Sequence, residues 1–283
     1  MAHQLRHTVN CSLLFTELPL LERPAAARQA GFGAVEFWWP FVEAVPPDRQ
    51  VDAFVAAITD AGVQLTGLNF FAGDMPGGDR GLVSWPKRAG EFRDNVDVVV
   101  GIGSRLGTLG FNALYGNRLD EVAAEEQDEL AVENLALAAR AAARLGATVL
   151  LEPVSGAPRY PLLTAADALA VIDRVDLQGS TAARRAEDPA ADLPALGLLA
   201  DLYHLAVNGD DVERVIADHT HRIAHVQIAD APGRGEPGSG TLPLDQQLTA
   251  LEANGYTGLV GLEYKPSTTT DECFGWLPFE RRR

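Results

Sequence analysis

Short, continuous apolar runs alternate with longer amphipathic segments along the whole chain. An apolar run of four to eight residues between turn residues is typical of a strand that is buried on both faces of a parallel sheet. The segments between the runs carry the spacing and composition of helices. The expected strands are residues 7–14, 34–37, 64–70, 108–112, 148–152, 197–201, 223–228 and 259–263.

Five of the expected helices end at a glycine. Glycine after the last helical turn takes the left-handed backbone conformation that closes a helix. The strongest expected helix spans residues 119–145, which are rich in Ala, Glu and Leu, with Glu early and Arg late, as the helix dipole favours. The glycine stops are Gly31, Gly62, Gly107, Gly146 and Gly255.

Eight strand–helix units in a chain of 283 residues favour one closed (β/α)8 TIM barrel over an open doubly wound sheet. Residues 98–107 superficially resemble a dinucleotide-binding fingerprint, but the third glycine comes one residue late, and the end of a helix is the better interpretation. Residues 178–193 are polar and Ala-rich without a clean period, and predict a surface insertion. Residues 280–283 predict a short, solvated C-terminal tail. The expected organisation is a single domain over residues 1–283.

Composition narrows the class of protein. The net charge of −16 argues against nucleic acid as a partner and disfavours an anionic membrane. No stretch approaches the roughly 18 apolar residues that cross a bilayer, and Asn10 and Ser12 interrupt the first apolar run, so no signal peptide is expected. The two cysteines, Cys11 and Cys273, make no disulfide framework. We expect a cytoplasmic protein with a small-molecule substrate, and leave a homo-oligomer open.

The last four apolar runs each end on a residue that can bind a metal. A buried carboxylate must be paired, protonated or bound to a cation. Active sites of such barrels form at the C-terminal ends of the strands. The four runs are the expected fifth to eighth strands, which are neighbours around the barrel, so the side chains at their ends can converge. Three carboxylates and an amide form an all-oxygen set that suits Mg²⁺ or Mn²⁺ better than Zn²⁺. The alternative is that they bond to loop backbone or pair with arginine at the barrel rim. The four residues are Glu152, Asp201, Gln227 and Glu263.

A cation held by two glutamates suggests a reaction. The cation can chelate the adjacent carbonyl and hydroxyl oxygens of a small substrate and stabilise the enediolate that forms when a proton is lost. Glu152 and Glu263 can remove and return that proton. This chemistry is isomerisation or epimerisation without a redox cofactor.

Several strings of residues together resemble the hydroxypyruvate isomerase family, which belongs to the xylose-isomerase-like TIM barrels. The resemblance extends from about residue 9 to residue 276. Leu68 departs from it, because some members have a histidine just before the asparagine of the third strand. The strings include Val35-Glu36-Phe37, Glu91-Phe92-Arg93-Asp94, Leu151-Glu152-Pro153, Asp201-Leu202-Tyr203-His204, Gln227-Ile228-Ala229-Asp230, Arg234-Gly235-Glu236-Pro237-Gly238 and Glu263-Tyr264-Lys265-Pro266.

The resemblance implies that Glu152, Asp201, Gln227 and Glu263 bind the divalent metal and that the two glutamates transfer the proton. Related ketose 3-epimerases usually carry a histidine at the strand end where this chain has Gln227, which favours the hydroxypyruvate branch. The expected reaction interconverts hydroxypyruvate and 2-hydroxy-3-oxopropanoate (tartronate semialdehyde).

Four further residues are candidates for substrate binding. The resemblance makes His204 a hydrogen-bonding partner, against the alternative of a loop histidine satisfied by backbone. Arg234 either clamps a substrate carboxylate or pairs with Glu236. Glu36 bonds to a substrate hydroxyl or supports another residue, and Lys265 neutralises the carboxylates or is a rim lysine. Residues 73–81 lack the Lys-Ser/Thr of a phosphate loop and are interpreted as a lid.

Several rival functions remain open on the sequence alone. The first is a 2-oxo-tetronate isomerase or a ketose 3-epimerase of the same superfamily, which the width of the pocket would distinguish. The second is a barrel that binds a sugar acid without turnover, which would not need both glutamates. The third is a DNA-repair barrel, which would need more histidines than the six present and a basic face.

Overall fold

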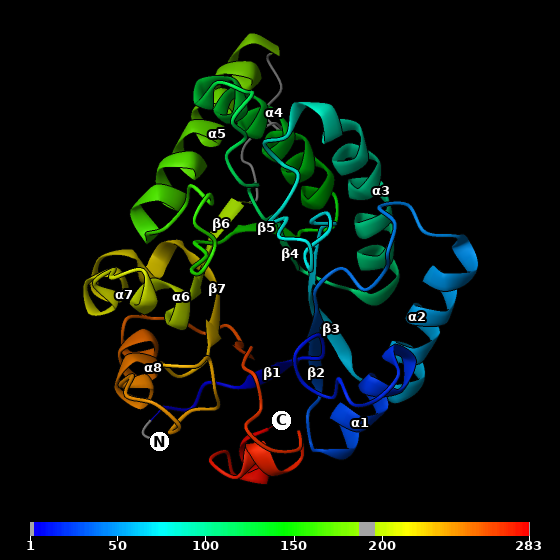
Figure 1. The fold of residues 1–283 in the computed structure, drawn as a ribbon, viewed down its shortest axis with the longest axis vertical. Helices are drawn as coiled ribbons and strands as arrows, with labels where there is room; N and C mark the ends of the chain where they lie inside the picture. The colour runs from blue at the N-terminus through cyan, green and yellow to red at the C-terminus, as the bar shows by residue number, and fades with distance from the viewer. Residues whose placement is uncertain (1–2, 187–195, 283) are drawn as a thin grey trace.

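A computed structural model describes residues 3–186 and 196–282, and its eight parallel strands close into a barrel in chain order (Figure 1). The last strand pairs with the first, with His7 opposite Val260. This closed sheet confirms the (β/α)8 architecture expected from the alternating pattern. The strands are β1 (His7–Asn10), β2 (Ala34–Phe37), β3 (Gln64–Asn69), β4 (Gly110–Asn112), β5 (Thr148–Leu151), β6 (Leu196–Asp201), β7 (Ile223–Ile228) and β8 (Val260–Leu262).

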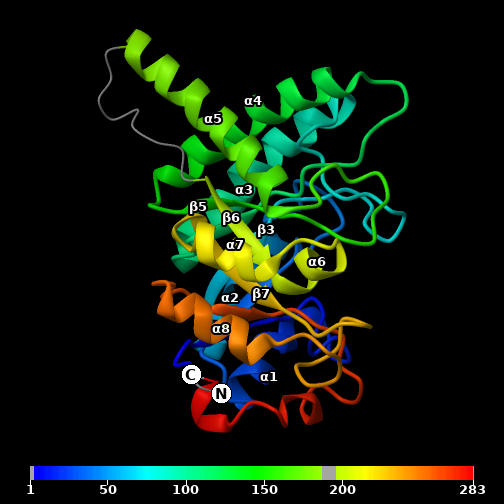
Figure 2. The ribbon, with the colours of Figure 1, turned by 90° about the vertical axis from the view of Figure 1, so that its left-hand side faces the viewer.

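The helices form an outer layer around the barrel, and the hydrophobic core fills the space between the two layers (Figures 1 and 2). The strands are short, and β2, β5 and β6 are almost entirely buried, as expected of parallel strands covered on both faces. The α-helices are α1 (Arg23–Gln29), α2 (Asp48–Ala61), α3 (Ala89–Leu106), α4 (Ala124–Ala143), α5 (Ala165–Ala186), α6 (Leu202–Val207), α7 (Val212–His219) and α8 (Leu244–Ala253).

Several element boundaries differ from the expected ones, most clearly the end of β1 and the start of α4. Strand β1 stops at Asn10, because the backbone N–H groups of Leu13 and Leu14 turn back to the Asn10 carbonyl at 3.2 and 3.0 Å. Helix α4 begins at Ala124 instead of residue 119, and the side chain of Gln127 in its first turns accepts the N–H of Leu119 at 3.0 Å.

The interpretation of residues 98–107 as the end of a helix is confirmed. Helix α3 ends at Leu106, and Gly107 closes it in the left-handed conformation with φ of 68°. The expected insertion at 178–193 begins inside a helix, since α5 continues to Ala186 despite its irregular pattern. Residues 187–195 lie outside the described residues, so the insertion itself stays a prediction.

Of the expected solvated tail, Glu280 is exposed, whereas Arg281 and Arg282 are packed against the body of the protein. Arg282 donates to the Ala30 carbonyl at 2.9 Å, and its guanidinium lies 5.2 Å from the Phe274 ring centre. Arg281 donates to the carbonyl of His3 near the start of the chain. Within the described ranges, no helix is long and apolar enough to cross a membrane.

Candidate active site

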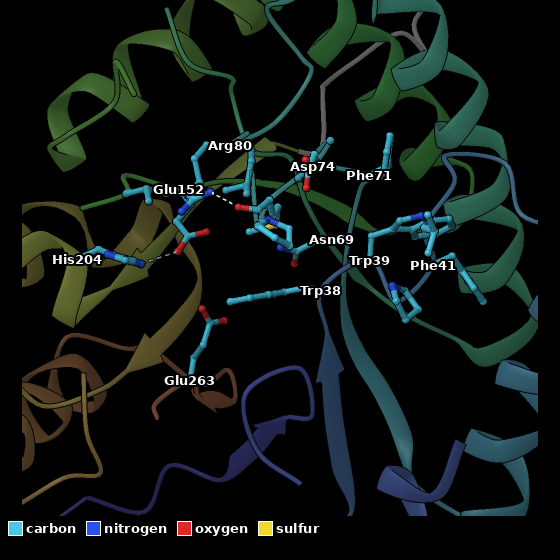
Figure 3. Close-up of a pocket in the computed structure, with 18 of the residues that line it drawn as sticks. Trp38, Trp39, Phe41, Asn69, Phe71, Asp74, Arg80, Glu152, His204 and Glu263 are labelled. Atoms are coloured by element: carbon cyan, nitrogen blue, oxygen red, sulfur yellow. Dashed lines mark hydrogen bonds and ion pairs between the residues drawn. The ribbon is translucent and has the colours of Figure 1, made fainter. Parts of the chain in front are cut away.

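The C-terminal ends of the strands open into a cavity of about 870 Å³ (Figure 3). Glu152 follows β5, Glu263 follows β8, and both side chains line this cavity with His204 and Arg234. Their carboxylates face the same space beside the Trp38 ring (Figure 3). The side chains expected to converge from distant parts of the chain therefore do converge.

Glu152 is held from the neighbouring strand. Asn112, the last residue of β4, donates its side-chain N–H to Glu152 Oε2 at 2.7 Å. Glu152 is almost fully buried, and burial, followed by the negative charges of Glu263 and Asp201, raises its pKa well above the usual value. The raised pKa makes this carboxyl group a candidate proton acceptor and donor.

Glu263 is held in the same way across the seam of the barrel. Asn10, the last residue of β1, donates to Glu263 Oε2 at 2.8 Å, and Arg234 donates to Glu263 Oε1. Burial raises the pKa of Glu263 to about 7, although the Arg234 guanidinium pulls it down. Each of the two glutamates is thus oriented by an asparagine from an adjacent strand.

Asp201 is the last residue of β6 and also caps the short helix that follows. Its Oδ1 accepts the backbone N–H groups of Tyr203 and His204 at 2.9 and 3.3 Å. Its Oδ2 is buried and accepts no hydrogen bond from a described residue, with the Arg234 guanidinium 3.6 Å away. One oxygen of Asp201 is therefore fixed by backbone, and the other can bind a ligand.

Gln227 lies beside Asp201 in the register of β6 and β7, but it points to a different partner. Its Nε2 donates to Glu36 Oε2 at 3.0 Å, and this fixes the orientation of the amide because a carboxylate accepts. The buried Gln227 Oε1 has no hydrogen-bond partner in the described structure. It is a second buried oxygen that can serve as a ligand.

Glu36 is buried inside the barrel and accepts the hydrogen bond from the side chain of Gln227. Its second oxygen, Oε1, forms an ion pair with His225 Nε2 at 2.8 Å, and the described cavity lining does not include Glu36. Burial lowers the pKa of His225, but the Glu36 carboxylate outweighs it, so the pKa is raised. These contacts favour the interpretation that Glu36 supports another residue over a contact with a substrate hydroxyl.

His204 is buried, and its hydrogen bonds define its tautomer. The backbone N–H of Ser155 donates to His204 Nδ1 at 3.1 Å, so Nδ1 is an acceptor and the proton of a neutral ring is on Nε2. Burial lowers the pKa of His204 to about 4, so the ring is neutral at pH 7. His204 Nε2 lies 3.6 Å from Asp201 Oδ2 and 3.9 Å from Glu152 Oε1.

The donor set fits a hard divalent cation. Glu152, Asp201 and His204 offer ligand atoms that all lie within 4.8 Å of one another. The protonated Nε2 of His204 cannot coordinate a metal while Nδ1 accepts from Ser155, so His204 is better placed as a hydrogen-bond donor. The carboxylates and the free Gln227 oxygen leave an all-oxygen set, as Mg²⁺ or Mn²⁺ prefers.

Arg234 forms ion pairs with the carboxylates of Glu263 and Asp201 through its Nη2. Besides Glu263 and Asp201, its guanidinium lies 5.7 Å from the Tyr203 ring centre, and its backbone is left-handed with φ of 60°. A non-glycine residue in this conformation is uncommon and carries strain that its surroundings must offset. Of the two alternatives for Arg234, the pairing with Glu236 is not found, because Glu236 bonds instead to the backbone N–H and hydroxyl of Ser267; the contact with a substrate carboxylate stays a prediction.

Lys265 is the one predicted substrate-binding residue that lies at the exposed rim. Its side chain is exposed, and its backbone N–H donates to the Arg234 carbonyl at 2.7 Å. It is not among the described residues that line the cavity. The rim alternative therefore fits Lys265 better than a role in neutralising the carboxylates.

Four residues of the site were missed in the sequence. Asn112 carried a signal, since it ends an expected strand as the predicted ligands do, whereas Asn10 lay inside the expected first strand. Ser155 and Arg80 carried none, because both lie in loops whose course the sequence does not reveal. The fold brings all four to the same rim, either in the cavity lining or bonded to it.

Residues 24–278 match the family described as Xylose isomerase-like TIM barrel, and the chain belongs to this family. A putative hydroxypyruvate isomerase of Streptomyces coelicolor is 52% identical, with 96% of this chain and 95% of the relative covered. At 31% identity, the hydroxypyruvate isomerase of Escherichia coli (96% and 98% covered) and the 2-oxo-tetronate isomerase of Cupriavidus necator (96% and 97%) also match. These relatives place the chain in the hydroxypyruvate isomerase family.

A solved structure of similar fold comes from Brucella melitensis and is named as an AP endonuclease of family 2. It is 31% identical with a TM-score of 0.83, and the match covers 96% of this chain and 97% of that one. The curated relatives are named as isomerases, and the protein is accordingly an enzyme of the isomerase class.

Proposed function

We propose that the protein interconverts hydroxypyruvate and 2-hydroxy-3-oxopropanoate through an enediolate. The observation that carries the proposal is the pair of buried glutamates, Glu152 and Glu263, which face one cavity from β5 and β8. The names of the relatives support the choice of substrate.

The chemistry needs one proton to move between adjacent carbons. A glutamate removes a proton from C3 of hydroxypyruvate, and the proton is returned to C2, while the hydroxyl proton moves from the oxygen on C3 to the oxygen on C2. The pKa of Glu263, about 7, suits such transfers near neutral pH, and the pKa of Glu152 is raised in the same direction. His204 Nε2–H is a neutral donor that can bond to the substrate oxygens as charge develops on them.

A divalent cation, Mg²⁺ or Mn²⁺, would be held by Glu152, Asp201, Gln227 and Glu263. When bound, it supplies Lewis-acid stabilisation of negative charge on the two substrate oxygens. The support for this ligand set is the two buried oxygens, Asp201 Oδ2 and Gln227 Oε1, that lack a hydrogen-bond partner among the described residues. In this protein Arg234 holds Glu263 Oε1, so Glu263 has its other oxygen, shared with Asn10, to offer.

An assay of the pure protein against hydroxypyruvate, 2-oxo-tetronate and a set of ketoses tests the proposal. Proton NMR in D₂O follows both the conversion and the loss of substrate protons to solvent. We expect kcat/KM to be highest for hydroxypyruvate, with deuterium entering the product at the carbon that receives the proton. A higher kcat/KM for a ketose would contradict the substrate, and the absence of exchange with any substrate would contradict the reaction.

A 2-oxo-tetronate isomerase is the second candidate. The cavity of about 870 Å³ is near the upper end of the roughly 300–1,000 Å³ that small-molecule sites occupy, so it accommodates a four-carbon acid. The relative from Cupriavidus necator carries that name. The net charge of −16 still disfavours action on DNA, although the structurally similar Brucella protein is named as an endonuclease.

A further inference from the structure

Three arginines line the described part of the cavity, and two of them are already paired. Arg234 is bound to Glu263 and lies near Asp201. Arg88 forms two hydrogen bonds to the Glu91 carboxylate, at 2.8 and 2.7 Å, and one to Asp79 at 3.0 Å. Arg88 thus uses all three of its guanidinium nitrogens on carboxylates, whereas Arg234 uses Nη2 alone and keeps a buried Nε without a hydrogen-bond partner among the described residues.

Arg80 differs from both, because its guanidinium bonds to neutral groups. Its Nη1 donates to the backbone carbonyls of Met75 and Asp79 at 3.0 and 2.7 Å. Neither Nε nor Nη2 donates to a described residue, and no described carboxylate lies within ion-pair distance of them. Nε–H and Nη2–H form one edge of the guanidinium, and this edge matches the two oxygens of a carboxylate.

The position of Arg80 is fixed by the loop that carries it. Its backbone carbonyl accepts from the N–H of Gly116 at 2.9 Å, and the next residue, Gly81, donates to the Ala72 carbonyl at 3.0 Å. The side chain lies over the cavity on the side of Glu152 (Figure 3). The Arg80 charge also contributes to lowering the pKa of His204, after burial and Arg234, so it acts on the same site.

We propose that Arg80 binds the carboxylate of the substrate through Nε and Nη2 and thereby selects 2-oxo and 2-hydroxy acids over neutral ketoses. This inference rests on the proposed function and names the residue that recognises the acid. It gives Arg234 a different role, in which Nη2 neutralises buried Glu263. Breaking a buried ion pair is strongly unfavourable, so we expect this contact to persist when the substrate binds.

Binding of an unreactive acid tests the assignment independently of turnover. Glycerate has the carboxylate and hydroxyls of the substrate but no carbonyl, and glycerol is its neutral counterpart. In calorimetric titrations we expect the wild type to bind glycerate more tightly than glycerol, and Arg80→Gln to weaken glycerate binding roughly 10- to 100-fold, as loss of charge-assisted hydrogen bonds predicts. Arg80→Lys keeps the positive charge but cannot form two parallel hydrogen bonds to a carboxylate. Its affinity for glycerate should therefore lie between those of the wild type and Arg80→Gln.

Turnover gives a second readout. Dihydroxyacetone and glyceraldehyde interconvert by the same proton transfer without a carboxylate, so Arg80→Gln should lower kcat/KM for hydroxypyruvate while leaving that for dihydroxyacetone unchanged. Arg88→Gln is the matched control, an arginine of the same cavity that should leave this selectivity unchanged. A fall with dihydroxyacetone as large as with hydroxypyruvate would show a general loss of the site and overturn the assignment.

Other outcomes separate this inference from the proposed function. If Arg80→Gln bound glycerate as tightly as the wild type, or if the wild type did not prefer glycerate to glycerol, Arg80 would not be the carboxylate site. If no substrate turned over while Arg80→Gln still lost glycerate binding, the reaction would be wrong and the role of Arg80 would stand.

Discussion

At the scale of single residues, the site depends on how two buried carboxyl groups are held. Asn10 and Asn112 each donate one hydrogen bond to a glutamate on the next strand of the barrel. A buried charge without partners is costly, and these amides reduce that cost while fixing the direction of each carboxylate. The reactive groups therefore depend on neighbours that carry no charge themselves.

The first prediction concerns the glutamate pair. Glu152→Gln and Glu263→Gln should each lower kcat for the isomerisation by roughly 10²–10⁴-fold, because glutamine is isosteric but cannot transfer a proton. Deuterium exchange of the substrate, followed by NMR, should fall in parallel. Glu129→Gln, at an exposed position of α4, is the control that should keep full activity. A variant of either buried glutamate with near wild-type exchange would show that its carboxyl group does not transfer the proton.

The four strand-end residues were recognisable in the sequence because a polar residue after an apolar run is conspicuous. Their individual partners were not recognisable. Whether Arg234 turns to Glu236 or Glu263 depends on how its loop folds, and nothing in the local sequence distinguishes a neighbour two residues away from one across the barrel mouth. The role of Glu36 was open for a related reason, because a strand-end position does not reveal whether a side chain points into the cavity or the barrel interior.

At the scale of elements, the loop between β3 and α3 forms one wall of the cavity and needs close backbone approach. Gly81 has φ of 104°, and a Cβ atom there would overlap the Leu114 carbonyl oxygen. Gly78, in the same loop, has a similar φ of 109° but open space around its missing side chain. The two glycines therefore separate backbone strain from steric contact.

The second prediction uses this difference. Gly78→Ala should lower the free energy of unfolding by about 1–3 kcal/mol, the usual cost of a left-handed non-glycine residue. Gly81→Ala carries the same strain and also displaces the loop from Leu114, so it should raise KM as well. Thermal unfolding and steady-state kinetics measure the two effects. Equal KM values for both variants would mean that this contact does not shape the cavity.

The strands and most helix ends were predictable because each has a local signal, an apolar run or a glycine stop. The start of α4 was not, since its N-cap residue, Ala123, has no side chain that could signal a helix start. The helical course of α5 to Ala186 was also missed, because a polar, Ala-rich stretch without a period does not show which of its faces packs. In both cases the local pattern of apolar residues was too weak a signal.

At the scale of the whole molecule, folding brings several carboxylates together at one site, so a bound cation should stabilise the folded protein. The third prediction is that Mn²⁺ or Mg²⁺ raises the melting temperature of metal-free protein progressively with metal concentration, and that EDTA abolishes activity. Asp201→Asn should reduce the metal-induced shift in melting temperature. A shift in the variant as large as in the wild type would show that Asp201 is not a metal ligand. Full activity of the EDTA-treated protein would show that the reaction needs no metal.

The fourth prediction concerns stability in acid and uses His7 at the opposite end of the barrel. Burial lowers the pKa of His7 to about 4 from 6.5, so the folded protein binds this proton less readily than the unfolded chain. The stability from neutral His7 is therefore present above pH 6.5 and is lost as the pH falls through 4. His7→Gln should show a smaller loss of melting temperature between pH 6.5 and 4.5. If His7→Gln lost as much melting temperature over this pH range as the wild type, His7 would not contribute to the loss of stability in acid.

The seam between the first and last strands has a consequence for when the enzyme can work. Glu263, just beyond β8, takes its orienting hydrogen bond from Asn10 on β1, so its geometry is complete only when the two termini of the sheet have met. A ribosome-bound chain that still lacks its eighth strand also lacks one member of the proposed catalytic pair. The onset of turnover during synthesis would thus report the last step of assembly rather than the first.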